Sequence, residues 1–418
     1  MTSTCPPAGT VVSTNGLTDM AGIAVATVQA GTTVGAFTVK ARVIVGMRTI
    51  EVYSPTIGLR GAKPTNKSFS LVCTPFNISA YISAAPPKLI NVDCKARVAD
   101  RFNNAVGTGT TVNFKSEVGT IPASIASKIY DPATSNPEEG TALVTFSTQG
   151  AFPAVPTEPL AADPNQFPTP RPAEPSVADG QITRNPRDGL VTIIAYTHGE
   201  EFYDDANSNG KWDSNERFYD EGEPFVDSND NGVWDSNEFY VDDNGDGVYN
   251  GPNNKWDSDK SVWAMAHILY TGSPDPTNSH WTPSTLNVPK AALVNASFYF
   301  LDLNMNRITN EFTFSGANIA ISKAGFSVTL NDMGPLPDGF GMNIESDWLD
   351  ATTGKECLST STRCLYSTRF RSWPMGFGGT ITAKGADATD MTPPITFGYR
   401  LDAKGPLPGS ITLPITAQ

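Results

Sequence analysis

The acidic segment 200–260 constrains the fold of this 418-residue chain more than any other feature. It carries 18 Asp and Glu residues against four Lys and Arg residues, a net charge of −14. The rest of the chain holds 25 acidic and 25 basic residues, so the whole net charge lies in this one segment. Charge at this density repels itself unless cations bind it. The sequence also excludes nucleic acid as a partner, because nucleic-acid binding needs a basic face.

Two stretches of the segment match the calcium-binding loop D-x-[DN]-x-[DN]-G-x5-E: DANSNGKWDSNE at 205–216 and DSNDNGVWDSNE at 227–238. Such a loop supplies oxygen atoms from positions 1, 3, 5, 9 and 12 and a carbonyl from position 7, and glycine at position 6 permits the turn. The sequence therefore predicts two Ca²⁺ sites. The predicted ligands are Asp205, Asn207, Asn209, Lys211 (carbonyl), Asp213 and Glu216 in the first loop, and Asp227, Asn229, Asn231, Val233 (carbonyl), Asp235 and Glu238 in the second.

A third loop begins in the same way, but Asn253 occupies its position 12. The stretch KWDSDK at 255–260 is similar to KWDSNE at 211–216, so Asp257 is the candidate to close the third site through an enlarged loop. The sequence leaves open whether this loop binds an ion. Its predicted ligands are Asp242, Asn244, Asp246, Val248 (carbonyl) and Asp257.

The stretches between the loops are too short for the helices that flank each loop of a calmodulin-type sensor. The loops therefore resemble the helix-less, EF-hand-like calcium repeats of secreted bacterial proteins, which implies structural calcium. Trp212, Trp234 and Tyr249 recur at loop position 8, and with the FY pairs at 202, 218 and 239 they predict a small aromatic core.

Outside the acidic segment the pattern is that of an all-β protein. Period-two stretches rich in β-branched residues lie at 69–76, 88–100, 109–116, 141–148 and 188–197, and 261–272 is also strand-like. The acidic segment is thus predicted to be an insert between two strands. Eight prolines at 151–175 predict an extended loop inside the domain, whose flanking strands would pair with each other.

Three units are predicted. Residues 1–60 supply too few strands for a sandwich, which needs roughly seven strands and 100 residues, and are taken as the closing strands of a partial unit. Residues 61–272 form a β-sandwich with the proline-rich loop and the calcium insert. Residues 273–418 form a C-terminal β-sandwich with a strand-like tail at 405–418.

The cysteines indicate an oxidising, extracellular setting. Cys73 and Cys94, and Cys357 and Cys364, are close enough in sequence for local disulfides, and Cys5 is left over. No run reaches the roughly 18–20 apolar residues of a membrane span. The first residues lack the regions of a signal peptide, so the chain is expected to be a mature protein or a segment of a longer one.

Several stretches resemble bacterial immunoglobulin-like domains of the invasin/intimin type (Big-1-like). TNGLTDMAGIAVATVQAGTTVGAFTVKARV at 14–43 is similar to their closing strands, VADRFNNAV at 98–106 to an early strand and turn, and 189–210 to members with a calcium insert. The resemblance implies tandem immunoglobulin-like β-sandwiches on a cell surface, used for adhesion or as a stalk, without catalytic residues.

The favoured function is therefore an extracellular structural protein, a calcium-rigidified stalk or a filament subunit, whose partners are neighbouring copies or upstream immunoglobulin-like domains. In the filament variant, one chain's tail completes another chain's open sandwich. Two alternatives stay open: an adhesin module that binds a protein or glycan, and a non-catalytic accessory domain of a secreted enzyme. No GxSxG, HExxH, P-loop or dinucleotide motif occurs, so the chain is not expected to be an enzyme.

Overall fold

The computed structural model describes the chain except for 1–8, 12–15, 32–34, 60, 83–86, 107–108, 130–137, 154–157, 283–285, 289–292, 310, 319–326, 335–342, 373–376, 385–394, 401–408, 414 and 418. Within the described residues, regular structure is almost entirely β-strand. The helical elements there are short 3-10 turns: η1 (Asn66–Ser68), η2 (Ala80–Ile82) and η3 (Pro186–Gly189). None of the described helices is long and apolar enough to cross a membrane. The predicted all-β class is confirmed.

Two sheets face each other in the central unit. One has the order β12 (Thr141–Ser147), β9 (Asn91–Val98), β7 (Phe69–Thr74). The other has the order β11 (Ser124–Ala126), β10 (Thr111–Ser116), β15 (Leu190–Gly199), β17 (Lys260–Tyr270), β8 (Asn77–Ile78). Every second residue of β9 is buried, as expected where one face of a strand packs on a facing sheet. Val92 and Ala96 of β9 share one hydrophobic core with Ile193 of β15.

The strand order in this unit is that of an immunoglobulin domain. The strands β7, β9, β10, β12, β15 and β17 correspond in chain order to strands A, B, C, E, F and G, with A, B and E in one sheet and C, F and G in the other. The short strand β8 runs parallel to the end of β17, while the other pairs in both sheets are antiparallel. The predicted immunoglobulin-like sandwich is therefore confirmed here.

The prediction that the strands on either side of the proline-rich loop pair with each other is wrong. Strand β12 pairs with β9, whereas β15 pairs with β10 and β17 in the opposite sheet. Alternating hydrophobic residues show that a strand has one buried face, but they do not show which sheet it joins. The loop 151–175 crosses from one sheet to the other, and its described part contains one isolated bridge, between Asp163 and Arg171.

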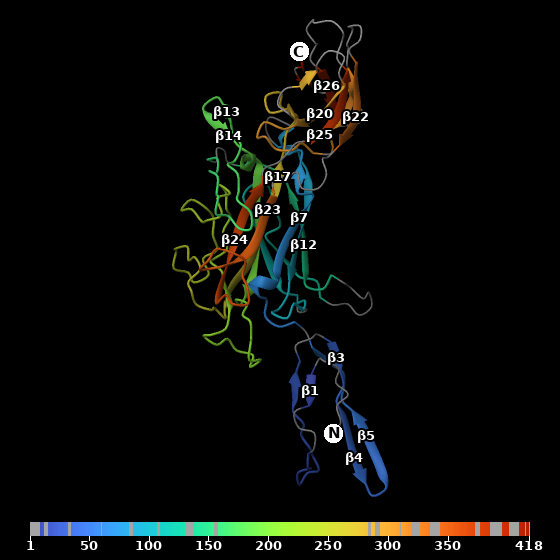
Figure 1. The fold of residues 1–418 in the computed structure, drawn as a ribbon. Coiled ribbons are helices and arrows are strands. Elements are labelled where there is room, and N and C mark those ends of the chain that lie inside the picture. Colours follow the sequence, from blue (N-terminus) through green and yellow to red (C-terminus); the bar gives the residue numbers. More distant parts are fainter. Residues whose placement is uncertain are drawn as a thin grey trace.

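The acidic segment connects β15 to β17, as predicted. These strands pair without a register shift from Leu190 opposite Leu269 to Gly199 opposite Lys260. The two ends of the segment therefore lie side by side at the end of a hydrogen-bonded ladder. Its loops lie along the outside of the central unit (Figure 1).

The C-terminal unit also contains two sheets. One has the order β18 (His280–Thr282), β20 (Leu293–Phe300), β25 (Phe377–Lys384), β22 (Ser327–Gly334). The other has the order β21 (Thr313–Asn318), β26 (Ile395–Arg400), β27 (Gly409–Leu413). Strand β28 (Ile415–Ala417) pairs in parallel with β19 (Leu286–Val288). The predicted strand-like tail is therefore paired within its own chain, through β27 and β28.

One hairpin leaves the C-terminal unit and joins the central one. It consists of β23 (Asn343–Asp350) and β24 (Arg363–Ser372), and β24 pairs in parallel with β16 (Phe218–Asp220) of the acidic segment. Figure 1 shows the hairpin alongside β17. The three predicted domain ranges stay a prediction, and residues of the third range contribute to the surroundings of the second.

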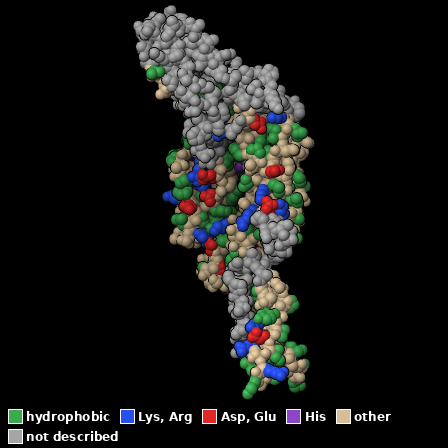
Figure 2. Space-filling view, turned by 90° about the vertical axis from the view of Figure 1, so that its right-hand side faces the viewer, with side chains coloured by type: hydrophobic (Ala, Val, Ile, Leu, Met, Phe, Trp, Pro, Cys, Tyr) green, Lys and Arg blue, Asp and Glu red, His purple; other side chains and the backbone are tan. Residues whose placement is uncertain are grey.

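The N-terminal unit consists of paired strands. Strand β1 (Gly9–Val11) pairs with β2 (Val28–Ala30), β3 (Gly35–Phe37) with β6 (Ile57–Leu59), and β4 (Lys40–Val45) with β5 (Arg48–Tyr53). Residues 48–59 thus supply partners for the strands at 35–45. Apolar side chains remain exposed on β4 and β5, among them Ile44 and Val52, and Figure 2 shows hydrophobic side chains on the surface of this unit.

Candidate calcium sites in the acidic segment

The first predicted calcium loop is closed by two carboxylates. Asp205 at position 1 accepts hydrogen bonds from the backbone N–H groups of Asn209 (2.9 Å) and Gly210 (2.8 Å), and Gly210 has a φ of +76°. Glu216 at position 12 accepts from the N–H groups of Ala206 (2.8 Å) and Asp213 (3.0 Å). Backbone donors thus hold both carboxylates in place.

The second loop repeats this pattern. Asp227 accepts from the N–H groups of Asn231 (3.0 Å) and Gly232 (2.7 Å). Glu238 accepts from the N–H groups of Ser228 (2.7 Å) and Asp235 (2.9 Å). In both loops the indole N–H at position 8 donates to the backbone carbonyl of position 12: Trp212 donates to Glu216, and Trp234 donates to Glu238.

Oxygen-bearing side chains converge inside each loop. The amides of Asn207 and Asn209 both donate to Asp213 Oδ2, at 2.7 and 2.8 Å. The amides of Asn229 and Asn231 both donate to Asp235 Oδ2, each at 2.7 Å. The side chains at positions 3, 5 and 9 therefore lie together in each loop, and their binding of calcium stays a prediction.

The third loop is closed by Glu223, not by Asp257 as predicted. Asp242 accepts from the N–H groups of Asp246 (3.2 Å) and Gly247 (2.8 Å), as position 1 does in the first two loops. Glu223 accepts from the N–H groups of Asp243 (2.9 Å) and Asn250 (2.8 Å), which occupy positions 2 and 9. Glu223 lies 19 residues before the start of this loop, so a motif read along the chain cannot include it.

Asp257 belongs to a fourth arrangement built from separate stretches. Asp220 accepts from the N–H groups of Asn253 (3.1 Å) and Asn254 (2.8 Å). Asn254 has a φ of +63°, the conformation that glycine has at position 6 of the other loops. Asp220, Asn253 and Asn254 therefore correspond to positions 1, 5 and 6.

Glu201 closes this fourth arrangement. It accepts from the N–H groups of Glu221 and Asp257, both at 3.0 Å, which correspond to positions 2 and 9. Trp256 donates to the Glu201 carbonyl at 2.7 Å, as Trp212 does to Glu216. Sequence reasoning missed Glu201, Asp220 and Glu223. The similarity of KWDSDK to KWDSNE was the available signal, because it aligns Trp256 with Trp212.

Several carboxylates of the segment are buried with few cations nearby, whereas Asp242 and Asp246 of the third loop are exposed. Glu201 and Asp220 have no exposed surface, and Asp227 is 1% exposed. Burial raises the pKa of Glu201 to about 7, although Lys260 lies 3.3 Å away, and burial likewise raises the pKa of Asp227 to about 7. Arg363 contacts Asp220 at 3.0 Å. Buried carboxylates of this kind are costly unless a cation compensates them.

The donor chemistry fits calcium, which takes six to eight oxygen ligands from carboxylates, amides and backbone carbonyls. In the described part of the chain, no three His, Cys, Asp or Glu side chains gather as a metal site by themselves. The loops instead combine carboxylates with Asn amides and carbonyl groups. The fit therefore rests on the donor types and the repeated hydrogen-bond pattern.

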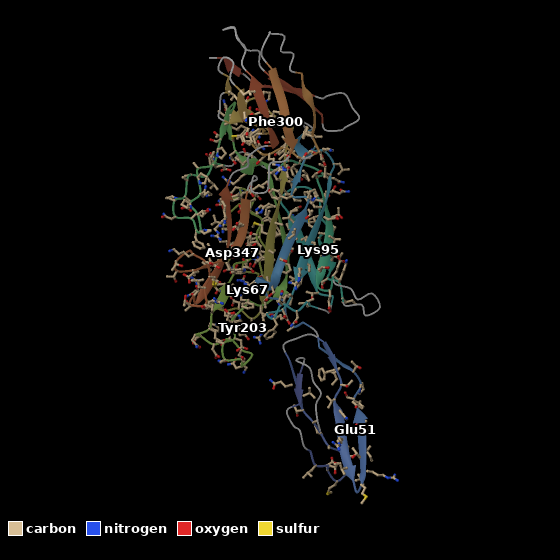
Figure 3. All side chains as sticks on the ribbon, turned by 45° about the vertical axis from the view of Figure 1, so that its right-hand side comes forward. Glu51, Lys67, Lys95, Tyr203, Phe300 and Asp347 are labelled. Atoms are coloured by element: carbon tan, nitrogen blue, oxygen red, sulfur yellow. A yellow bond between two sulfur atoms is a disulfide. The ribbon has the colours of Figure 1, made fainter. Side chains whose placement is uncertain are left out.

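The aromatic residues of the segment form separate groups, not the single core predicted. Trp234 stacks on Tyr249 with ring centroids 4.7 Å apart, and Trp212 stacks on Trp256 at 6.0 Å. Tyr203, on the first stretch of the segment, contacts Trp256 edge-on at 5.2 Å. Figure 3 shows Tyr203 and Lys67 at the end of the central unit that faces the N-terminal unit, and Asp347 higher on the hairpin.

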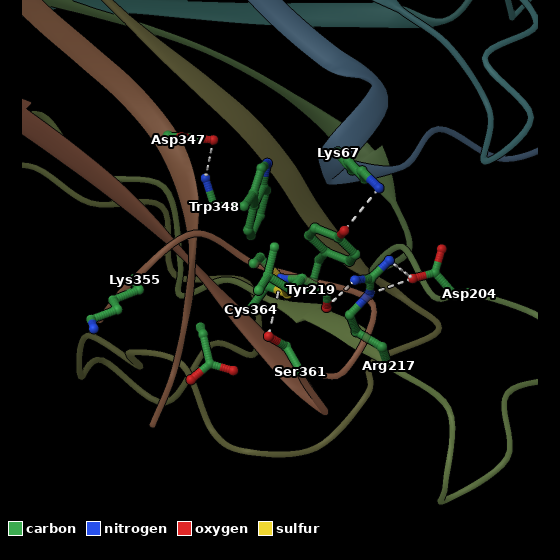
Figure 4. The surroundings of a disulfide bond; sticks show 12 residues. Lys67, Asp204, Arg217, Tyr219, Asp347, Trp348, Lys355, Ser361 and Cys364 are labelled. Atoms are coloured by element: carbon green, nitrogen blue, oxygen red, sulfur yellow. Dashed lines mark hydrogen bonds and ion pairs between the residues drawn. A yellow bond between two sulfur atoms is a disulfide. The ribbon is translucent and has the colours of Figure 1, made fainter. Parts of the chain in front are cut away.

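The hairpin β23–β24 holds the segment from outside. Trp348 of β23 packs edge-on against Tyr219 of β16 at 5.2 Å, and Lys67 donates to the Tyr219 hydroxyl at 2.8 Å (Figure 4). The guanidinium of Arg217 contacts Asp204 and the carbonyl of Leu358. These contacts join three stretches that are distant in sequence.

Both predicted cysteine pairs form disulfides. Cys73 and Cys94 lie directly opposite each other on β7 and β9, with Cα atoms 4.1 Å apart. Cys357 and Cys364 link the β23–β24 connection to β24, with Cα atoms 5.8 Å apart, and Cys364 lies beside Tyr219 (Figure 4). Cys5 lies outside the described residues.

Comparisons with known proteins give weak structural likenesses. No family model matches the chain, and no curated protein matches it. FdeC, a broadly conserved adhesin of Escherichia coli, is 9% identical with a TM-score of 0.29, covering 100% of this chain and 87% of that chain. The adhesin InvE of Yersinia pseudotuberculosis is 11% identical with a TM-score of 0.19, covering 84% of this chain and 60% of that chain. The fold assignment rests on the strand pairing and takes nothing from these scores.

Proposed function

We propose that this chain is part of an extracellular, cell-surface protein of the adhesin type, in which immunoglobulin-like sandwiches form a stalk and Ca²⁺ stiffens the acidic segment. The role is structural and not catalytic. Sandwich domains with local disulfides suit an oxidising exterior. A stalk is favoured over a filament subunit because the C-terminal tail is paired with β26 and β19 of its own chain.

One observation carries the calcium proposal: the same hydrogen-bond pattern occurs four times in the acidic segment. In each case one carboxylate accepts from positions 5 and 6 and another accepts from positions 2 and 9. The four closing carboxylates are Glu216, Glu238, Glu223 and Glu201. We therefore assign four calcium sites, two within continuous loops and two assembled from separate stretches.

The fourth site explains how calcium would stiffen the domain. Its groups come from Glu201 at the start of the segment, Asp220 in β16 and Asp257 near the end. A calcium ion held there would tie both ends of the segment to β16, and β16 is paired with β24 of the C-terminal hairpin. Calcium would in this way reduce motion between the central unit and the hairpin.

Calcium stoichiometry tests the proposal. Native mass spectrometry and calorimetry of the full chain should find four ions, with dissociation constants of about 10⁻⁴–10⁻³ M, as in extracellular calcium modules. Two ions would restrict binding to the continuous loops and refute the assembled sites. No binding at millimolar calcium would refute the calcium role altogether. Magnesium at the same concentration is the control. It should bind more weakly, because Mg²⁺ requires a near-ideal octahedral set of ligands that such loops do not provide.

A further inference from the structure

The two continuous calcium loops have the same types of predicted ligand but different surroundings. Both carry carboxylates at positions 1, 9 and 12 and Asn amides at positions 3 and 5. In the first loop, residues 206–211 are all exposed. In the second loop, positions 1 to 4, at 227–230, are buried or half-buried. The second loop is therefore packed against the rest of the domain, whereas much of the first loop is open to solvent.

A buried arginine holds the backbone of the second loop. Arg187 of η3 is 2% exposed, and its Nη1 donates to the carbonyls of Asn229 (2.6 Å) and Asp230 (3.0 Å), which occupy positions 3 and 4. Its Nε donates to the Glu174 carboxylate at 3.0 Å, and its Nη2 donates to the Glu158 carbonyl. The guanidinium thus joins the second calcium loop to the proline-rich loop.

The side chain of Asp230 provides a second anchor. Its Oδ1 accepts from the hydroxyl of Thr192, on β15, at 3.2 Å. Position 4 has a positive φ in both loops, +54° at Asp230 and +58° at Ser208. This conformation is unfavourable for residues other than glycine unless their surroundings hold it. Arg187 and Thr192 hold it at Asp230, whereas Ser208 is exposed.

We propose that Arg187 is a positioning residue of the second calcium site: it holds this loop in its ion-binding conformation, so that this site fills before the site of the first loop. The inference rests on the proposed calcium function. Calcium loops with the same number of ligand charges differ in affinity through their rigidity, and a loop that is already held in its bound conformation loses less freedom on binding. The second site should therefore be half-saturated at about tenfold less calcium than the first.

Hydrogen–deuterium exchange of the full chain during a calcium titration tests this order of filling. Peptides that cover 205–216 and 227–238 report the two loops separately in the same sample. The peptide from the second loop should become protected first, with its midpoint at about tenfold less calcium. Equal midpoints, or earlier protection of the first loop, would refute the positioning role and leave the calcium function intact. Protection of neither loop by calcium would refute both.

The variant Arg187→Lys assigns the effect to the guanidinium. Lysine keeps the positive charge but lacks the planar fork that reaches all four acceptors of Arg187. The midpoint of the second loop should rise about tenfold, while the midpoint of the first loop should stay unchanged. The matched control Arg184→Lys, on β14 (Ile182–Arg184), should change neither midpoint. If the second loop still filled first by the same margin in Arg187→Lys, the order would have another cause, such as Arg101 at 3.7 Å from Asp205 in the first loop, and the positioning role would be wrong.

A second variant tests the same anchoring if Arg187→Lys does not fold. Thr192→Val keeps the shape of the side chain and removes the hydroxyl that donates to Asp230. The midpoint of the second loop should rise about fivefold, the loss expected for one buried hydrogen bond, and the first loop should again not respond. An equal shift in both loops would indicate a general loss of stability and would contradict the positioning role.

Discussion

At the scale of single residues, the proposed calcium sites depend on four glutamates that occupy equivalent positions. Glu216 and Glu238 close loops in which they are the last residue, whereas Glu223 and Glu201 precede the residues that they close over. All four accept hydrogen bonds from the N–H groups of positions 2 and 9. The four glutamates are therefore equivalent in the hydrogen bonds that they accept, but not in their distance along the chain from the loop.

Substitution of each closing glutamate should therefore affect its own site. Glu216→Gln, Glu238→Gln and Glu223→Gln should each remove one ion from the bound count and weaken that site about tenfold or more, because a bidentate charged ligand is lost. Asn253→Gln should leave the third site intact, since Asn253 contacts Asp220 and Asp257 instead. Native mass spectrometry of each variant measures this. If the third site still bound calcium in Glu223→Gln, a residue other than Glu223 would have to complete that site.

A buried histidine makes stability depend on pH. Burial lowers the pKa of His267 to about 4 in the folded protein, against about 6.5 when unfolded. The unfolded chain alone takes up this proton between pH 6.5 and 4, so the free energy of unfolding should fall as pH falls through that window, by at most about 3 kcal/mol. The buried Asp230 carboxyl, 3.9 Å away, has a raised pKa and so offers little negative charge to hold an imidazolium.

Urea denaturation in calcium at pH 7 and pH 5 measures this loss. The variant His267→Gln should lose less stability over the same interval, because it has no imidazole to protonate. A loss as large in His267→Gln as in the unchanged chain would assign the effect to the carboxylates instead.

At the scale of elements, the acidic segment is held by the hairpin β23–β24 and, in the proposed function, by calcium ions. One set of its core contacts lies on β17, where Phe225, Val226 and the cluster of Trp234 and Tyr249 pack on Trp263 and Met265. Hydrogen bonds between carboxylates and backbone N–H groups recur throughout the segment. Order in this element should therefore depend on calcium far more than order in the sandwich does.

Limited proteolysis should show this difference. In chelator, cleavage should be confined to 200–260, because its 18 acidic residues repel one another without bound cations. Millimolar calcium should suppress that cleavage. The sandwich strands β9 and β15 serve as the internal control and should resist in both conditions. Equal resistance of the segment with and without calcium would contradict a stiffening role.

The hairpin should matter most when calcium is absent. Arg363→Ala leaves the buried carboxylate of Asp220 without its guanidinium and should cost about 3 kcal/mol in chelator. Calcium at the fourth site would compensate Asp220, so the cost should be clearly smaller in calcium. Arg371→Ala on the same strand is the matched control. Its partner Glu345 is more exposed, and the loss should stay within about 1 kcal/mol in either condition. If Arg363→Ala lowered the free energy of unfolding equally in chelator and in calcium, Asp220 would not be a calcium ligand.

At the scale of the whole molecule, sandwiches are linked by strands that cross between units. The hairpin at 343–372 joins the central unit, and the tail strands β27 and β28 fill edges in the C-terminal unit. Each of these pairings occupies backbone groups that would otherwise attract a strand from another chain. The C-terminal unit is thus expected not to recruit a strand from another chain at the edges that β27 and β28 cover.

Deletion of 406–418 should uncover the edges of β26 and β19. The full chain should be monomeric by light scattering, and the deletion should associate with itself or lose stability in the C-terminal unit, because open edges pair with other strands. The two disulfides and calcium binding should persist in the deletion. A full chain that forms end-to-end polymers, abolished by the deletion, would restore the filament interpretation.

The sequence by itself determined the features whose parts lie close together along the chain. The strands follow from period-two hydrophobicity, and the two continuous loops follow from Asp, Asn and Glu residues within twelve positions around glycines that adopt positive φ. The disulfides join cysteines 21 and 7 residues apart. Each of these depends on local geometry, which a short stretch of sequence encodes.

Only the tertiary structure decided which distant pieces meet. It placed β12 and β15 in opposite sheets, closed the third loop with Glu223, and brought Glu201, Asp220 and Asp257 together. The pairing of β15 with β17 sets this outcome, because it holds residues 199 and 260 opposite each other and so folds the segment back on itself. Such contacts depend on strand register and packing across the whole domain, which no local spacing records.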